Sequence, residues 1–530
     1  MLYYVFAMNY DFNEDYQYDS CVSRGICSVN PRTSSLQEVL LMYLKLAAFY
    51  ASKLLENGVE DSEMREIILG TISVIVSNPE FSEFDFRTLT ERFNAVLAKS
   101  KSEYEKICEE KNIVPEVIKS VIRIDKEFDV IKSIRLGERE FLKKTSSIPS
   151  EIRDLYKILF VLAKSICINV FDLESFGEDA DYGYLMILKL LNSLNVVQKE
   201  DAKLKEFMFE VADVDNRLMH QLRAAQEERY GRQRIKEVSY TTTPAKAVLV
   251  VGSNIRELED ILEAFDGTGV DVYTHDEMML ANTFPKFDEY KNLKGQFGQG
   301  MENCLLDFAT FPGPIVLTRH SLYNVEHLYR GLLYTTDFAC SKGVIPIKDK
   351  DFSPVNKAAE GAKGFKTGRQ CESVSIGFDL EEFIENLKKS VDGYRKIVVI
   401  GLAGYTLEQQ SYFEKFLEQV PDDILVVSLS FCKQKKNVIC LNACFDSYAI
   451  LKVVDGIKDV TNLPLVLIFP KCDRHTMSQM LYLSQWENTT IYVGKCTPII
   501  LNPNLINTLN KAFGLRGLSS VRKDLDDIKK

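Results

Sequence analysis

The chain has 530 residues, 46% of them hydrophobic and 27% charged, a composition typical of a globular protein with several domains. Its net charge of -11 argues against nucleic-acid binding, which needs a basic surface. No uninterrupted apolar stretch reaches the roughly 18 residues that a membrane span requires. The apolar segment from Met1 to Met8 lacks the basic flank of a signal peptide, so we expect a cytoplasmic protein.

The first part of the chain carries helical patterns. Ser34 is a helix cap that precedes regularly spaced leucines, and Gly58 predicts the end of that helix. Pro115 and Pro149 suit the first turn of a helix, where a missing N–H is harmless. Further helices are predicted over residues 115–134, 149–170, 184–194 and 201–230. These patterns predict an N-terminal helical bundle over residues 1–235.

The pattern changes at Ala245, where apolar strands begin to alternate with helices. The order strand, helix, strand occurs twice, and it implies a parallel sheet with both faces covered. These elements are residues 246–252, 255–265 and 270–273, then 396–401, 407–419 and 424–428, with further strands at 463–469 and 491–493. We therefore predict a multidomain α and α/β protein, in which two Rossmann-like parallel-sheet domains, residues 236–375 and 376–530, follow the bundle.

Three polar or glycine-rich segments have simple structural interpretations. Residues 348–370 are rich in glycine and lysine, which is typical of a connecting segment. Residues 522–530 are a run of charges and are interpreted as a solvated end. Residues 295–300 lack the strand, GxGxxG, helix order of a phosphate loop, so their glycines are interpreted as structural.

The chain has twelve cysteines, and without an export signal we expect them to stay reduced. Cys108 and Cys167 lie within helical patterns and are predicted to be small core residues. Four other cysteines are candidates for a rearranged cluster or a zinc site, namely Cys432, Cys440, Cys444 and Cys472. Their spacing matches no standard zinc pattern, and the alternative is core thiols beside a buried sheet.

In open α/β sheets, functional groups collect in the turns at the carboxyl ends of the strands. The turns that this rule marks are Gly252-Ser253, His275 to Glu277, His320-Ser321, Gly401 to Ala403 and Phe431-Cys432. His275 and Glu277 are a candidate acid–base pair, although a structural role is the favoured interpretation of His275. Adjacent side chains rarely face one another, so a serine nucleophile activated by His320 is not favoured.

Several segments together resemble a known family. They are Cys21-Val-Ser-Arg-Gly-Ile-Cys27, Glu227-Glu-Arg-Tyr-Gly231, Gly267-Thr-Gly-Val-Asp-Val-Tyr-Thr-His-Asp-Glu-Met278, Tyr329-Arg-Gly331, Asp351-Phe-Ser-Pro-Val355 and Leu501-Asn-Pro-Asn504. In this order, over nearly the whole chain, they resemble the hybrid-cluster proteins, iron–sulfur oxidoreductases also called prismane proteins or hydroxylamine reductases. The resemblance implies the fold predicted above and an oxidoreductase that acts on small nitrogen species.

The resemblance also implies a cubane iron–sulfur cluster near the N-terminus, bound by four cysteines. Cys21 and Cys27 match the second pair of these cysteines, whereas residues 1–10 contain no cysteine to match the first pair. A [4Fe–4S] cluster normally takes four thiolates. Two chains of a homodimer could supply them across the dimer axis, as in the carbon monoxide dehydrogenases, a family related to the hybrid-cluster proteins. The alternative is a pair of free thiols.

The second centre that the resemblance implies is the hybrid iron–sulfur–oxygen cluster. Its histidine position is Ser253 here and one glutamate is retained as Glu277, whereas two of its cysteine positions are Ser321 and Ala403. Serine and alanine supply no soft thiolate, so we expect the hybrid cluster to be absent.

Some ligands of that centre do remain. The next family cysteine falls at Phe431 or Cys432, and the last is retained as Cys444. The second glutamate falls near Pro470, and a neighbouring family lysine falls near Cys472. The candidate metal ligands are therefore Glu277, Cys432, Cys444 and Cys472.

Two functions follow from the resemblance and from these replacements. The first is a hydroxylamine-reductase-like oxidoreductase in which Glu277 is the candidate catalytic residue. The alternative is a non-catalytic or repurposed paralogue, a dimer bridged by one [4Fe–4S] cluster, that acts in electron transfer or sensing. A purely structural partner protein is a third class. The sequence identifies neither the physiological substrate nor the electron-transfer partner.

Overall fold

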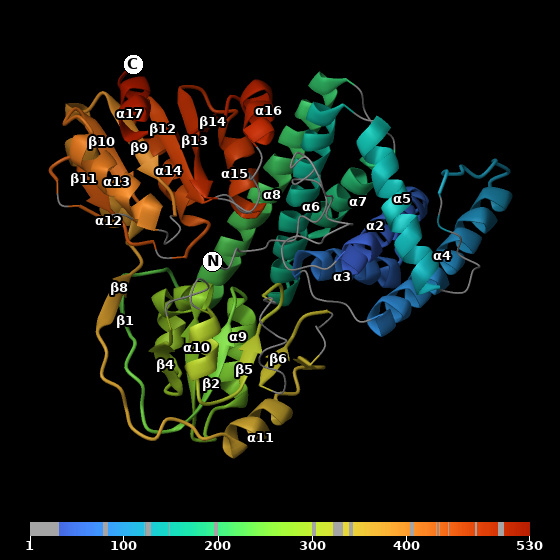
Figure 1. Cartoon of the computed structure of the whole chain (residues 1–530), viewed down its shortest axis with the longest axis horizontal. Helices are drawn as coiled ribbons and strands as arrows, with labels where there is room; N and C mark the ends of the chain where they lie inside the picture. The colour runs from blue at the N-terminus through green and yellow to red at the C-terminus, as the bar shows by residue number, and fades with distance from the viewer. Residues whose placement is uncertain are drawn as a thin grey trace.

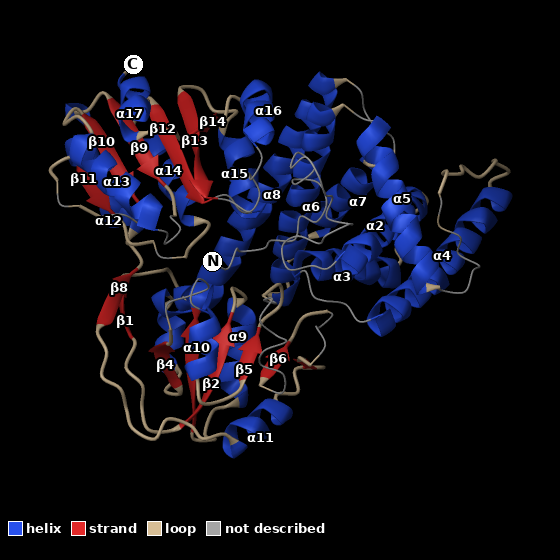
Figure 2. Cartoon of the chain, in the orientation of Figure 1, coloured by secondary structure: helices blue, strands red, loops and turns tan. Residues whose placement is uncertain are grey.

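The computed structural model describes residues 31–77, 83–120, 122, 129–147, 149–195, 200–298, 304–321, 332–338, 343–402, 407–430, 432–433, 435–443, 445–471, 474–496 and 503–530. A helical part and two α/β parts follow one another along the chain (Figures 1 and 2). Within these ranges, no helix combines the length and the apolar character needed to cross a membrane.

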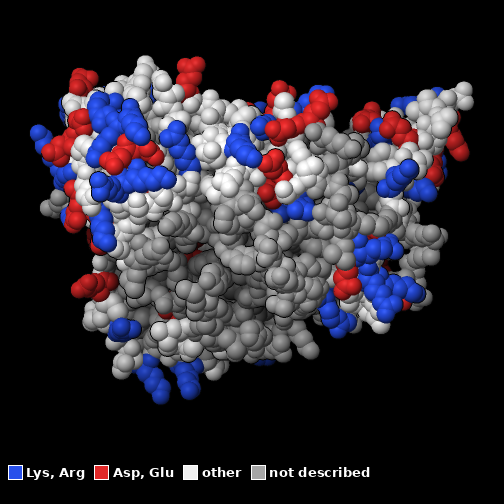
Figure 3. Space-filling model, turned by 45° about the horizontal axis from the view of Figure 1, so that its top comes forward, with Lys and Arg blue, Asp and Glu red and all other residues white. Residues whose placement is uncertain are grey.

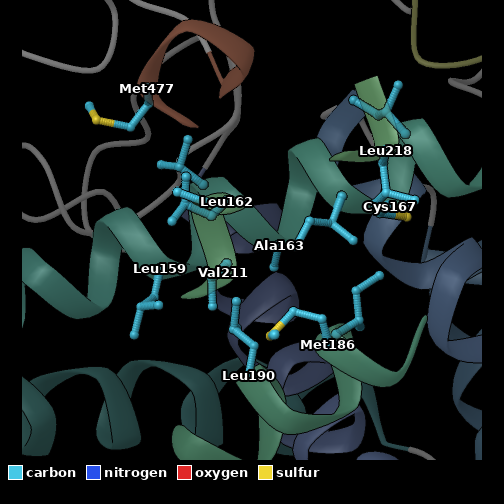
Figure 4. Close-up of a cluster of buried hydrophobic side chains, with 14 of the residues drawn as sticks. Leu159, Leu162, Ala163, Cys167, Met186, Leu190, Val211, Leu218 and Met477 are labelled. Atoms are coloured by element: carbon cyan, nitrogen blue, oxygen red, sulfur yellow. The ribbon is translucent and has the colours of Figure 1, made fainter. Parts of the chain in front are cut away.

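The helical part contains the elements α2 to α8. Their bounds are α2 Pro31–Glu56, α3 Ser62–Ser77, α4 Glu83–Glu110, α5 Val130–Ser147, α6 Ser150–Ser175, α7 Asp181–Ser193 and α8 Asp201–Tyr230. Helix α6 lies at the centre and packs against α7, α8 and a helix of the last domain, whose Met477 appears beside Leu162 in Figure 4. Cys108 and Cys167 are fully buried, which confirms the prediction of core thiols.

The prediction of a helix over residues 115–134 is wrong at its start. Residues 113–120 are not helical, and α5 begins only at Val130. Val114 and Val117 are 90% and 87% exposed, whereas Ile118 packs against the core, so this segment buries too few side chains to form one apolar helix face. A short helix without a buried face is marginal in water, and the favourable position of Pro115 does not compensate for that lack.

The first α/β part contains a six-stranded parallel sheet in the order β4-β3-β2-β5-β6-β7. Its strands are β2 Lys246–Val251, β3 Val270–His275, β4 Leu293–Gln296, β5 Ile315–Leu317, β6 Leu333–Thr335 and β7 Ile345–Pro346. The helices α9 Ile255–Ala264, α10 Cys304–Thr310 and α11 Ser353–Gly361 pack on this sheet, and two 3-10 helices, η1 Asp276–Thr283 and η2 Pro285–Glu289, follow β3. The predicted order strand, helix, strand is confirmed here.

The second α/β part contains another six-stranded parallel sheet, in the order β11-β10-β9-β12-β13-β14. Its strands are β9 Lys396–Ile400, β10 Ile424–Ser428, β11 Val438–Cys440, β12 Leu465–Lys471, β13 Thr489–Cys496 and β14 Arg516–Gly517. Its helices are α12 Leu380–Ser390, α13 Leu407–Gln419, α14 Ala449–Val460, α15 Arg474–Leu483, α16 Pro503–Phe513 and α17 Val521–Lys529, with the 3-10 turn η5 Val391–Gly393 after α12. The buried side chains on one face of this sheet are continuous with the core of the helical part.

A two-stranded antiparallel ribbon joins the two sheets. Its strands are β1 Lys236–Ser239 and β8 Ser373–Ile376, which lie where the chain enters and leaves the first α/β part. Figure 1 shows this ribbon at the edge of the molecule, between the two sheets.

The predicted connecting segment and the predicted solvated end each contain a helix that packs on a sheet. The segment 348–370 contains α11, whose Val355 and Ala359 are fully buried against the first sheet. The charged tail forms α17, in which Leu525 and Ile528 are each 2% exposed and pack on the second sheet. Apolar residues three positions apart face the same side of a helix, so a charged sequence can still bury one side.

Charged side chains of both signs share the molecular surface. On the face drawn in Figure 3, lysine and arginine lie among aspartate and glutamate. Pairs such as Arg395 with Asp423 and Lys511 with Glu151 are exposed, so each contributes little to stability.

A buried polar cluster joins the helical part to the last domain. Asp215 on α8 is fully buried and accepts a hydrogen bond from Asn169 Nδ2 at 2.7 Å. Ser165, which also contacts Asp215, lies 2.9 Å from His475 Nδ1 on α15. Burial raises the pKa of Asp215 to about 6, because removal from water disfavours the carboxylate more than its hydrogen bonds stabilise it.

We predict that Asp215 makes the protein less stable as pH rises from about 4 to about 6. Over this range Asp215 loses its proton in the unfolded chain but keeps it in the folded protein. The difference between the two pKa values of Asp215 corresponds to roughly 3 kcal/mol in the free energy of unfolding. Asp215→Asn should remove this pH dependence. The measurement is the free energy of unfolding in urea, compared between mutant and parent at several pH values over the same range. The half-buried Asp213→Asn is the control, and an Asp215→Asn difference that does not vary with pH would contradict the assignment.

Candidate functional site

The turn after β2 packs against the turn after β5. Gly252 has a φ of +124°, and a Cβ atom added there would lie 2.1 Å from Ser321 Oγ and 2.2 Å from Thr318 Oγ1. The Thr318 hydroxyl donates to the Val251 carbonyl at 3.1 Å, and the Ser321 hydroxyl donates to the Arg319 carbonyl at 3.3 Å. Both hydroxyls are thus bound to the backbone, in a corner with no room for a side chain at residue 252.

This corner carries two positions that the family resemblance assigns to cluster ligands. Ser253 is half-buried and follows Gly252 directly, and Ser321 is buried. The structure therefore brings the two turns together, as the rule on strand ends predicts. Both positions carry a hydroxyl, which is not the soft thiolate or the imidazole that would ligate iron there.

The turn after β3 holds His275 and Glu277. His275 is fully buried, its Nε2 lies 3.1 Å from Asp307 Oδ2 on α10, and its ring contacts Phe308 edge to face. This setting is that of a structural histidine whose ring is fixed by a carboxylate. Glu277 is half-buried in η1, directly after Asp276, whose φ is +56°.

The turn after β5 is tied to the helical part. His320 has a φ of +64°, its backbone N–H donates to Asp337 Oδ2 at 2.9 Å, and its ring packs against Phe171 of α6. Asp337 also accepts from the Ser73 hydroxyl of α3 at 3.1 Å. These contacts fix the direction of the turn that carries Ser321.

Glu257 is the carboxylate whose electrostatic setting in this region is most unusual. It lies in the first turn of α9, where it accepts from the Arg319 N–H at 3.0 Å and from the Thr336 hydroxyl. Burial raises the pKa of Glu257, while the Arg319 guanidinium and these hydrogen bonds oppose the rise. No local sequence pattern predicts these contacts of Glu257, because its partners lie more than 60 residues away along the chain.

In the second α/β part, the turn after β9 begins at Gly401, whose N–H donates to the Ile468 carbonyl at 2.8 Å. Cys432 follows β10 and forms a disulfide with Cys440 at the end of β11. This disulfide differs from the expectation that all cysteines stay reduced. The two sulfur atoms meet because the edge strand β11 brings Cys440 back beside the loop that carries Cys432. Several predicted site residues lie outside the described ranges, so the predictions on them stand as made: Cys21, Cys27, Ala403, Phe431, Cys444 and Cys472.

The carboxyl ends of the two sheets meet. Phe445, which follows β11, packs against Met279 of η1 and against the β1–β8 ribbon. The Gly377 N–H donates to the Asn442 carbonyl at 2.9 Å. We call this contact between η1 and residues 441–446 the junction. It brings the turn of Glu277 close to the segment that follows Cys440.

A buried ion pair that sequence reasoning missed holds the junction to α8. Arg223 Nη2 donates to Asp446 Oδ1 at 2.6 Å, and both side chains are less than 10% exposed. The guanidinium carbon lies 5.1 Å from the ring centre of Tyr448 and 5.7 Å from that of Phe284. Gln233 also donates to Asp446, at 3.3 Å. The two charged partners are 223 positions apart, so no local spacing predicts them.

At two of the ligand positions that the structure describes, Ser253 and Ser321, the side chains do not fit the hybrid cluster. Among the described residues, no three or more histidine, cysteine, aspartate or glutamate side chains come together as a metal site would require. Ser321, at a family cysteine position, is bound to a backbone carbonyl, and Cys432 is bound to Cys440. A cluster of several irons needs a continuous set of soft ligands.

Comparison with known proteins identifies the family. The model of the Prismane/CO dehydrogenase family matches residues 17–526, so the chain belongs to this family, as the hybrid-cluster resemblance predicted. Proteins named hydroxylamine reductase are similar over nearly their full length. That of Acidiphilium cryptum is 26% identical, with 95% of each chain covered, and that of Clostridium novyi is 26% identical, with 95% of this chain and 96% of the relative covered.

Solved structures of carbon monoxide dehydrogenases also overlap with the chain. A nickel-free carbon monoxide dehydrogenase from Thermococcus sp. AM4 gives a TM-score of 0.47 at 12% identity, covering 98% of this chain and 88% of that one. An alpha subunit of acetyl-CoA synthase/carbon monoxide dehydrogenase gives 0.45 at 11% identity, covering 96% and 84%.

We predict that Arg223→Ala lowers the free energy of unfolding by about 3–5 kcal/mol, because it leaves Asp446 buried without its counter-ion. Adding Asp446→Asn should recover part of this loss, and a double-mutant cycle in urea measures the coupling. Lys203→Ala on the same helix is the control, since its pair with Glu200 is exposed. Equal stability of the Arg223→Ala and Lys203→Ala proteins would contradict the role given to the pair.

Proposed function

We propose that this chain is an iron–sulfur redox protein of the hybrid-cluster type that acts in electron transfer or sensing, and that it does not reduce hydroxylamine at a family-type hybrid cluster. The observation that carries the proposal is the closed corner of Gly252, Thr318 and Ser321. This corner stands where the family places a histidine and a cysteine.

The geometry of the corner argues against a metal there. To ligate iron, the Ser321 hydroxyl would have to lose its hydrogen bond to the Arg319 carbonyl and then its proton. A hydroxyl is a hard and weakly acidic donor, so it replaces a cysteine thiolate poorly. Gly252 packs directly on Ser321. The two turns therefore cannot separate without breaking the hydrogen bond from the Thr318 hydroxyl to the Val251 carbonyl.

The iron–sulfur part of the proposal rests on family membership and on Cys21 with Cys27. Two thiolates per chain match half of the usual ligand set of a [4Fe–4S] cluster. A homodimer that shares one cluster would use all four. An electron-transfer partner would then donate to or accept from this cluster.

Hydroxylamine reduction is the second candidate, and two observations favour it. The similar proteins of Acidiphilium cryptum and Clostridium novyi carry that name. Glu277, the retained family glutamate, is half-buried at the carboxyl end of β3.

The first test is iron and acid-labile sulfide per chain in full-length protein made without oxygen. We expect about two irons per chain, which is half of a shared four-iron cluster. Cys21→Ser should remove the iron, whereas Cys371→Ser, at a half-buried free cysteine, should leave it unchanged. Iron well above two per chain would show that a second site is loaded and would contradict the proposal.

The second test is ammonia formation from hydroxylamine with a reduced dye as electron donor. We expect no turnover above that of the dye alone, whatever the iron content. The control is Glu277→Ala, which should not differ from the parent. Turnover that Glu277→Ala abolishes without loss of iron would establish the second candidate instead.

A further inference from the structure

The edge of the second sheet has an unusual connection. Strands β10 and β11 are parallel neighbours, and Ser428 pairs in register with Cys440. Only residues 429–437 join them, whereas parallel strands usually need a crossover of a dozen residues or more. Cys432 lies in this short connection, so the chain brings its sulfur to that of Cys440 with a Cα–Cα distance of 5.6 Å.

We propose that Cys432 and Cys440 are a redox-active pair that exchanges with external thiols and controls the junction. Cys432 is exposed and Cys440 is half-buried, so an external thiolate reaches Cys432 Sγ first. Lys433, Lys435 and Lys436 follow Cys432 in the chain, and positive charge nearby favours thiolates, although Lys433 and Lys435 also pair with Glu418 and Asp422. The proposal holds whether or not the chain binds an iron–sulfur cluster.

Two successive thiol exchanges reduce the disulfide between Cys432 and Cys440. An external thiolate attacks Cys432 Sγ, the bond between the two protein sulfurs breaks, and Cys440 leaves as a thiolate that takes a proton. A second external thiolate attacks the mixed disulfide and releases Cys432, which also takes a proton. The protein gains two electrons and two protons, and two external thiols become one disulfide.

The pair is coupled to the junction by a short stretch of backbone. The Leu441 N–H donates to the Ser428 carbonyl and the Ala443 N–H to the Leu429 carbonyl, each at 2.9 Å. Cys432 Sγ lies 3.9 Å from Asn442 Oδ1, and the Asn442 carbonyl accepts from Gly377. The disulfide therefore holds the start of residues 441–446, the segment that packs on η1.

The edge position explains why reduction should matter. Among the described strands, β11 pairs with β10 alone, over three residues, and its side chains are half-buried. Without the disulfide, this strand end is held by its pairing with β10 and by the hydrogen bonds of Leu441 and Ala443, whose side chains are buried. Loss of the cross-link therefore lowers the free energy needed to open this segment. The oxidised pair thus orders the junction, and the reduced pair loosens it.

The test equilibrates full-length, anaerobically made protein with dithiothreitol at graded ratios of oxidised to reduced form, followed by maleimide labelling and peptide mass mapping. Cys432 and Cys440 should lose labelling together and appear as one linked peptide. Cys371 should label at every ratio, and Cys440→Ser should leave Cys432 labelled throughout. Independent labelling of the two cysteines, or linkage of Cys432 to a different cysteine, would overturn the proposal.

Hydrogen exchange tests the coupling. On reduction, the amides of Leu441 and Ala443 should exchange about tenfold faster, while that of Val250 in the first sheet stays unchanged. Unchanged exchange at both would overturn the control of the junction. Iron content separates this proposal from the function proposed above, since Cys440→Ser should leave iron unaltered. Loss of iron in that variant would assign the two thiols to a metal site instead.

Discussion

The arrangement of the three parts depends on the buried pair of Arg223 and Asp446. Taking two charges out of water costs several kcal/mol each, so the pair is stable only when α8 and the segment after β11 are both in place. The rings of Phe284 and Tyr448 pack against the guanidinium. Because Phe284 belongs to the first α/β part and Tyr448 to the second, one side chain of the helical part fixes both sheets.

The junction that this pair fixes is made of unusual backbone. Of the eight non-glycine residues with positive φ among the described ranges, Asp276, Asn442 and Phe445 lie in the junction, and His320 lies in the turn after β5. Such conformations cost about 1–3 kcal/mol for bulky residues and persist only where the surroundings hold them. His320 is held by Asp337 and Phe445 by Met279. The chain thus keeps preorganised strand ends, which is what a site needs, although the family ligands there have changed.

Local sequence predicted most of the sheets and the long helices, because continuous valine and isoleucine runs and regular apolar spacing are strong signals. Helix α8 and strand β10 have the predicted bounds. The failures have a common cause. The charged tail forms a helix because Leu525 and Ile528 pack on the second sheet, and a local charge pattern cannot predict that contact. The predicted helix at Pro115 does not form, and Val114 and Val117 remain exposed. The rule on the carboxyl ends of strands correctly predicted that the turns of Gly252 and Ser321 lie together. It could not predict that His275 pairs with Asp307 or that Arg223 pairs with Asp446, because these contacts depend on the tertiary fold.

The ligand replacements on which the proposed function rests are compatible with the family fold. A bound cluster adds its binding free energy to folding, so a site stripped of ligands must replace that contribution. Here the replacement is internal, because Thr318 and Ser321 bond to backbone carbonyls and Gly252 closes the space between them. What remains adjustable is the junction, where the edge strand β11 is held by one neighbour and by the bond between Cys432 and Cys440. On the proposed function, such a fold orders its strand ends without a hybrid cluster, and a two-electron thiol reaction at Cys432 and Cys440 changes that order instead.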